Sequence, residues 1–117
     1  MAPSQIQVAI SSLQRLLNEE NSYYKEQEQQ ESRIAKLEKD KTDADGNREF
    51  TLRQERQALE ETKKVIPTLR ERITSAREKL ENMLDTAGND EERETAVQVL
   101  KAAKEQQKDD PVAGVST

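Results

Sequence analysis

Residues 48–86 read REFTLRQERQALEETKKVIPTLRERITSAREKLENMLDT, and this stretch decides the fold. Apolar side chains recur in it at intervals of seven residues, at Leu52, Leu59, Ile66, Ile73, Leu80 and, just beyond, Ala87. A companion series lies three residues later, at Thr62, Leu69, Ala76 and Met83. Two such positions in every seven residues form one stripe on a helix, and the stripe predicts a long helix that is packed along its length.

Pro67 lies in the middle of this predicted helix. Proline has no N–H to donate to the carbonyl of Lys63, and its ring crowds that carbonyl, at a cost of ~3 kcal/mol. The apolar repeat nevertheless keeps the same phase on both sides of Pro67, whereas a loop would normally reset it. We therefore expect one continuous helix that is kinked at Pro67.

A first helix is predicted over about residues 4–43. Ser4 and Gln7 match the capping box, in which each side chain bonds the other residue's backbone N–H. The apolar stripe that follows consists of Ile6, Ile10, Leu13, Leu17, Tyr24, Ile34 and Leu37, and it is interrupted by Glu20, Gln27 and Glu31. The interruption indicates weaker packing in the middle of the helix, either as a solvated stretch or as a part that serves a partner.

Two turns separate three helices. The run Thr42–Asn47 contains the Asp, Gly and Asn residues that end helices, and Gly88 suits the end of the second helix, predicted at about residues 48–86. Asn89 or Asp90 can cap a third helix over about residues 90–108. The chain is thus predicted to be all-α, an elongated, coiled-coil-like antiparallel bundle of three helices over residues 1–108, with a flexible tail at residues 109–117.

Composition argues against catalysis. The chain has no cysteine and no histidine, which excludes thiolate or imidazole metal sites and the triads that depend on histidine. Its three glycines form no phosphate-binding loop, and Asp40, Asp43 and Asp45 lack the longer ligand array of a calcium loop. The net charge of -5 disfavours nucleic acid, and no apolar run is long enough to cross a membrane. We expect a binding protein without enzyme activity or cofactor.

The sequence resembles the tubulin-binding cofactor A (tubulin-specific chaperone A) family. Proline inside an unbroken heptad contributes most to the resemblance, and the surrounding residues agree in order and spacing over about residues 12–85. In the first helix these are Arg15, Leu16, Glu19, Glu20, Tyr24, Lys25, Glu26, Gln29, Gln30, Glu31 and Ile34. In the second they are Phe50, Gln54, Leu59, Glu61, Ile66, Pro67, Leu69, Arg72, Ile73, Ala76 and Leu80, whereas Thr68 stands where many members have an acid.

The resemblance implies a chaperone that captures near-native β-tubulin after its release from the cytosolic chaperonin. It would hold β-tubulin for the downstream cofactors that assemble the αβ-heterodimer, without nucleotide, in the cytoplasm and in association with the cytoskeleton. A homodimer is compatible with the family. The matching residues that we expect to contact the partner are Tyr24, Lys25, Glu26, Gln30, Glu61 and Arg72, and all but Tyr24 are expected to lie off the apolar stripe.

Two other functions fit parts of the sequence. A coiled-coil scaffold or dimerisation module would use the regular stripe of the second helix to bind a different protein. A prefoldin-like subunit also has long antiparallel helices, but it needs strands between them, and the Thr42–Asn47 turn is too short for a hairpin. Binding to β-tubulin would separate the first of these from the family function.

Overall fold

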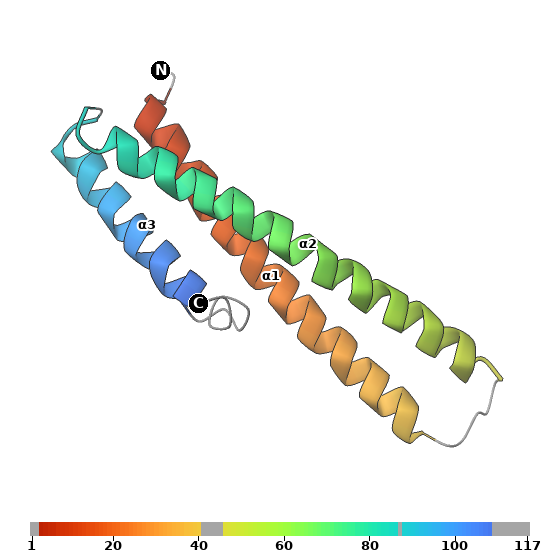
Figure 1. Ribbon diagram of the computed structural model, residues 1–117. Helices are drawn as coiled ribbons and strands as arrows, with labels where there is room; N and C mark the ends of the chain where they lie inside the picture. Colours follow the sequence, from red (N-terminus) through yellow and green to blue (C-terminus); the bar gives the residue numbers. More distant parts are fainter. Residues whose placement is uncertain (1–2, 41–45, 87, 109–117) are drawn as a thin grey trace. The chain divides into compact units, whose positions relative to one another are not determined.

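Three helices make up most of the described chain. The computed structural model describes residues 3–40, 46–86 and 88–108, and within these ranges it contains no strand (Figure 1). Helix α1 spans Gln5–Lys39, α2 spans Arg48–Met83 and α3 spans Asp90–Lys108. The predicted all-α, three-helix architecture is therefore confirmed.

Helix α2 runs without interruption through Pro67. The predicted stripe faces inward: Leu52, Thr62, Ile66, Leu69, Ile73 and Leu80 are buried, and Leu59, Ala76 and Met83 are half-buried. Because proline offers no N–H, the helix continues here through packing of its apolar stripe rather than through its full set of hydrogen bonds. The continuity is confirmed, and the kink at Pro67 stays a prediction.

Helices α1 and α2 end before the expected residues, whereas α3 has the expected bounds. Helix α1 ends at Lys39, and Asp40 already lies outside it, while the rest of the expected end, residues 41–43, falls outside the described residues. Helix α2 ends at Met83 rather than near Thr86, because Thr86 N donates to the carbonyl of Met83, a tighter turn than that of an α-helix. Residues 44 and 45, Ala87 and the predicted tail at 109–117 also lie outside the described residues.

Capping boxes start the first and third helices. Gln7 N donates to Ser4 Oγ over 3.2 Å, and Ser4 N donates to Gln7 Oε1 over 3.0 Å, as the sequence predicts. At α3, Glu92 N donates to Asn89 Oδ1 over 2.8 Å, and Asn89 N donates back to Glu92 Oε1 over 3.0 Å. Asn89 is therefore the cap of α3, one of the two residues that the sequence offered.

Gly88 makes the turn before α3 possible. Its φ of +84° belongs to the left-handed region, where a side chain is strained. A Cβ at this position would also lie 2.9 Å from Ile6 Cγ2, so the turn passes close to the first residues of α1. Both the backbone angle and this close approach require glycine.

The described residues belong to two compact units. The sequence predicted one bundle over residues 1–108. The first, the three-helix unit, consists of Met1–Glu19 and Leu69–Thr117 and contains the first part of α1, the last part of α2 and all of α3. Gln106 Nε2 donates to the carbonyl of Leu17, and Gln107 Nε2 donates to Thr74 Oγ1. Its buried apolar residues are Ile6, Ala9, Ile10, Leu13, Leu17, Leu69, Ile73, Leu80, Ala96, Val99, Leu100 and Ala103.

The second, the two-helix unit, is the antiparallel hairpin Glu20–Thr68. Arg48 closes its turn: Nε donates to the carbonyl of Leu37 over 2.7 Å, and Nη2 donates to that of Glu38 over 3.1 Å. Among its described residues the buried apolar ones are Ile34, Leu52 and Ile66, and the unit also buries the polar side chains of Glu20, Gln30 and Thr62. Two helices leave one flank of each uncovered, so this unit has the smaller apolar core.

Candidate partner-binding surface

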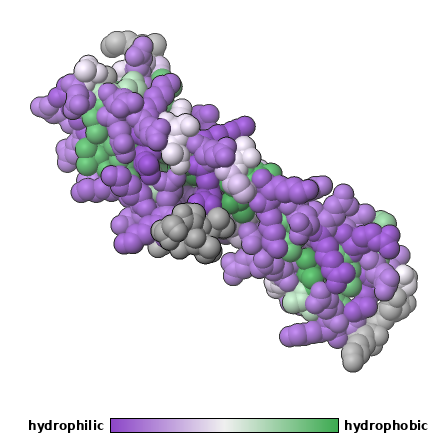
Figure 2. Space-filling model, in the orientation of Figure 1, coloured by the Kyte–Doolittle hydropathy of each residue, from purple (hydrophilic) through white to green (hydrophobic). Residues whose placement is uncertain are grey.

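Neither a candidate metal site nor a membrane-spanning helix occurs among the described residues. In residues 3–40, 46–86 and 88–108, no three acidic, cysteine or histidine side chains gather closely enough to hold a metal ion. No described helix is both long and apolar enough to cross a membrane. In the view of Figure 2 the surface is mostly hydrophilic, and hydrophobic residues show in a few separate patches. Surface charges and these apolar patches are the features that a protein partner can contact.

Three of the predicted contact residues are exposed on the two-helix unit. These are Lys25 and Glu26 on α1 and Glu61 on α2. None of the three makes an ion pair with another described residue. Their charges are therefore fully hydrated and open to a partner's charges.

Other charges of the same unit are already used inside it. Arg33 Nε lies 3.2 Å from Glu55 Oε1, and Arg56 Nη2 lies 2.9 Å from Glu38 Oε1, so each pair joins α1 to α2. Exposed pairs of this kind contribute at most about 1 kcal/mol each. They do, however, reduce the charge that these side chains present to another protein, which distinguishes them from Lys25, Glu26 and Glu61.

Gln30 does not lie off the apolar stripe, and that expectation was wrong. Only 3% of Gln30 is exposed, and its Oε1 has no hydrogen-bond partner among the described residues. Counting in sevens explains its burial, because Gln30 continues a series of inward-facing positions that begins at Ala9 and runs through Leu16, Tyr23, Gln30 and Leu37. Glu31, placed on the stripe by the sequence, is exposed instead. A buried amide cannot contact a partner without a rearrangement.

The remaining predicted residues have different surroundings. Tyr24 is half-buried and already interacts with another part of the protein. Arg72 is exposed and belongs to the three-helix unit, whereas Lys25, Glu26 and Glu61 belong to the two-helix unit. Pro67 is exposed on α2 and lies outside the core, and its structural role stays a prediction.

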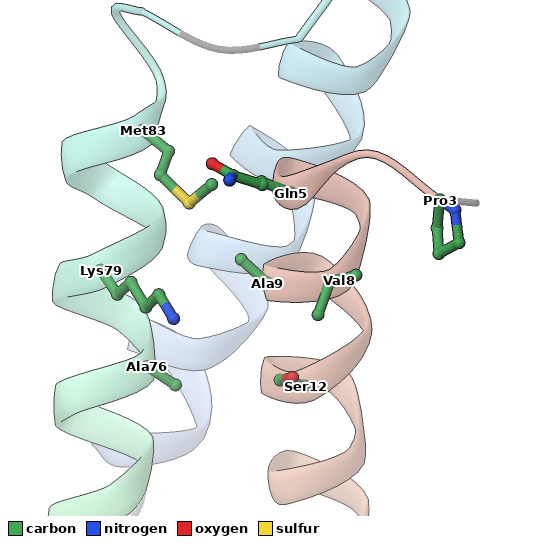
Figure 3. A pocket seen from close by; sticks show the side chains of 8 residues that line it. All are labelled: Pro3, Gln5, Val8, Ala9, Ser12, Ala76, Lys79 and Met83. Carbon is green, nitrogen blue, oxygen red and sulfur yellow. The ribbon is translucent and has the colours of Figure 1, made fainter.

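A hollow lies between α1 and α2 within the three-helix unit (Figure 3). It was not predicted from the sequence. Its volume is about 390 Å³. Val8, Ala9 and Ser12 line it from α1, and Ala76, Lys79 and Met83 line it from α2. The close-up shows the side chains of Lys79 and Met83 directed from α2 toward α1. We call this feature the α1–α2 hollow.

Small side chains create the hollow. Ala9 and Ala76 occupy inward-facing positions of the seven-residue repeat, where larger apolar residues stand elsewhere in both helices. Ser12, opposite Ala76 in the close-up, is equally small. A search for alanine at stripe positions of both helices would have detected this gap in the packing.

Known proteins of one family are similar to this chain in both sequence and structure. The family model described as tubulin binding cofactor A matches residues 1–107. Tubulin-specific chaperone A of Saccharomyces cerevisiae is 35% identical over 105 residues, which cover 90% of this chain and 95% of the yeast protein.

Two solved structures are similar as well. One is described as a β-tubulin-binding post-chaperonin cofactor, with 33% identity, a TM-score of 0.72 and coverage of 86% of this chain and 95% of the other. Tubulin folding cofactor A from Arabidopsis thaliana, at 24% identity and a TM-score of 0.72, covers 86% and 92% of the two chains and supports the fold.

Proposed function

The chain belongs to the tubulin-binding cofactor A family of tubulin chaperones, and from this premise we propose that it captures near-native β-tubulin after release from the chaperonin. The observation that carries the proposal is the match of the family model over residues 1–107, which include all three helices. The bound β-tubulin would be held for the cofactors that complete the αβ-heterodimer. The family's role is non-catalytic, and we propose the cytoplasm, near the cytoskeleton, as the place of action.

Local contacts must provide the affinity. The chain is acidic, with a net charge of -5, so overall charge does not attract it to an acidic partner such as tubulin. Exposed side chains that have no ion-pair or hydrogen-bond partner among the described residues are the best candidates for such contacts. Lys25, Glu26 and Glu61 meet this condition, and Arg72 meets it on the three-helix unit. Tyr24 and Gln30 meet it less well, because the fold already uses the first and buries the second.

Native-gel separation after incubation with freshly released α- and β-tubulin tests the proposal. We expect a complex with β-tubulin alone. The absence of a complex with either subunit would contradict the proposal and favour a coiled-coil scaffold or dimerisation module with a different partner. Sedimentation of the chain by itself would then show whether it forms a homodimer.

A second experiment tests the contact residues. The double variant Lys25→Glu, Glu61→Lys should weaken capture of β-tubulin about tenfold, as for a few lost charge contacts, while helicity stays unchanged. Arg53→Glu is the matched control, because Arg53 is equally exposed on the two-helix unit and lies outside the predicted contact set. If the double variant and the control bind equally well, Lys25 and Glu61 are not contacts.

A further inference from the structure

We propose that the α1–α2 hollow receives an apolar side chain from an acidic segment of the protein partner. This inference rests on the proposed function and assigns to it a contact site that the family match does not locate. Three properties of the hollow support it: an unfilled space whose lining is more apolar than polar, an exposed apolar rim, and positive charge along one edge that makes no ion pair with a described residue.

The space and its rim fit an apolar side chain. Ala9 and Ala76 line the hollow where larger side chains would have filled it. Val8, at the edge of the hollow, is 50% exposed, whereas the other two exposed valines, Val65 and Val97, are each 39% exposed. Met83 adds a flexible, polarizable side chain that adapts to the shape of a ligand group. A side chain placed here would remove Val8 and Met83 from water, which favours its binding.

The charge at the edge indicates an acidic neighbour. Lys79 is the one charged residue that lines the hollow, and it makes no ion pair with a described residue. Arg72 precedes Lys79 by seven residues and is also exposed and without an ion pair among the described residues. Seven residues of helix place the two on the same face about 10 Å apart. Two exposed cations on one helix face, neither of them in an ion pair with a described residue, favour a segment with carboxylates beside its apolar group.

This arrangement explains how an acidic chain can bind an acidic partner. This chain has a net charge of -5, so over longer distances it repels a partner that is also acidic. Salt screens exposed charges that lie more than about 8 Å apart, so contacts of a partner with Lys79 and Arg72 themselves count for more than the net charge of the chain. Binding should therefore weaken less with added salt than it would between oppositely charged proteins.

Point variants of the full chain test the inference, with freshly released β-tubulin as the probe in a native-gel titration. Val8→Asp removes the apolar rim, while Lys79→Glu and Arg72→Glu reverse the two charges. Val97→Asp and Lys101→Glu are the matched controls, since both residues are exposed on α3, which contributes nothing to the hollow. We expect each hollow variant to weaken capture about tenfold, which corresponds to about 1.4 kcal/mol, and each control to change it less than about twofold.

Circular dichroism and thermal melting check that every variant is folded, which the exposure of all five residues favours. If the hollow variants bind like their controls while the unmodified chain captures β-tubulin, the hollow is not the contact site and the proposed function stands. If the unmodified chain captures no β-tubulin, both are wrong. Tighter capture by the hollow variants would overturn the inference and assign the hollow to the chain's own segment Asp109–Val115, which also combines acids with valines. Dissociation of a dimer by these variants would likewise overturn it, in favour of a second copy.

Discussion

Ser4 Oγ donates a hydrogen bond of 2.6 Å to Glu92 Oε2 and so joins the start of α1 to the start of α3. Each residue already belongs to a capping box: Ser4 Oγ accepts from Gln7 N, and Glu92 Oε1 accepts from Asn89 N. The two boxes therefore share one contact. Both helices begin at the same end of the three-helix unit and run parallel within it, while α2 runs opposite to them.

Removing the Ser4 hydroxyl should destabilise the three-helix unit. Ser4→Ala loses the cap of α1 and the bond to Glu92, and we expect a loss of about 1 kcal/mol for the cap. Urea denaturation followed by circular dichroism measures it. Ser75→Ala serves as the control, because Ser75 is exposed inside α2 and alanine is the better helix former there. A loss in the control equal to that in Ser4→Ala would contradict a specific role for the hydroxyl.

The same bond should make stability depend on pH. The hydrogen bond from Ser4, and after it the one from the Asn89 backbone, lower the pKa of Glu92 below the ordinary value of 4.5. The folded state thus favours the carboxylate, so its contribution to stability is fully present above pH 4.5 and is lost as the pH falls through the lowered pKa.

Glu92→Gln removes this group, and melting temperatures between pH 7 and pH 3 provide the test. We expect the unmodified chain to be more stable than the variant at pH 7, and the difference to shrink as the pH falls below 4.5. Glu94→Gln, at an exposed position two residues later on α3, is the control. A difference between the unmodified chain and Glu92→Gln that stays constant over this range would show that ionisation of Glu92 is not involved.

The sequence predicts the helices better than it predicts their surroundings. A seven-residue repeat fixes which face of α2 is inward, and Ser4 with Gln7 fixes the start of α1, because both are local patterns. A local pattern does not determine which flank of a helix is covered by a neighbouring helix. Gln30 was therefore expected on the surface, although it lies on the inward-facing flank of α1. The α1–α2 hollow was missed for the same reason, since it depends on small residues from two helices together.

The sequence of α1 does indicate where a third helix can pack against it and where it cannot. The flank of α1 that is buried in the three-helix unit carries Ile10 and Leu17. At the following intervals of seven, in the two-helix unit, the residues are Tyr24, Glu31 and Glu38. The two glutamates are exposed, so they offer no apolar surface to a third helix.

Replacing Gln30 with methionine should stabilise the chain. A buried amide oxygen without a hydrogen-bond partner costs about 1–3 kcal/mol, and methionine has a similar size without this cost. Urea denaturation should show a gain of about 1 kcal/mol. Gln29→Met, at the exposed neighbouring position, should change stability by less than about 0.5 kcal/mol. If Gln30→Met is also fully able to capture β-tubulin, Gln30 is not a partner contact; a loss of stability would show that its amide is satisfied.

Amide hydrogen exchange should be faster in the two-helix unit than in the three-helix unit. Of the hairpin residues that the structure describes, the buried apolar ones are Ile34, Leu52 and Ile66, and local opening costs least where few apolar contacts are lost. We expect the amides of residues 26–36 to exchange before those of residues 8–17, although both stretches belong to α1. Mass spectrometry of peptides from the exchanged chain measures this within one molecule. Equal protection of both stretches would mean that α1 opens as a single unit.

Pro67→Ala tests the cost of proline inside α2. Alanine restores an N–H that can donate to the carbonyl of Lys63 and removes the ring that crowds it, and this proline penalty is about 3 kcal/mol. Since Pro67 is exposed, no packing is lost, and we expect thermal and urea stability to increase, by up to that amount if the helix straightens. Thr68→Ala, an exposed neighbour on the same helix, controls for helix propensity alone. If stability rises while capture of β-tubulin falls, the bend at Pro67 shapes the binding surface. If Pro67→Ala is no more stable than Thr68→Ala, then α2 is not strained at this residue, and the predicted kink loses its physical basis.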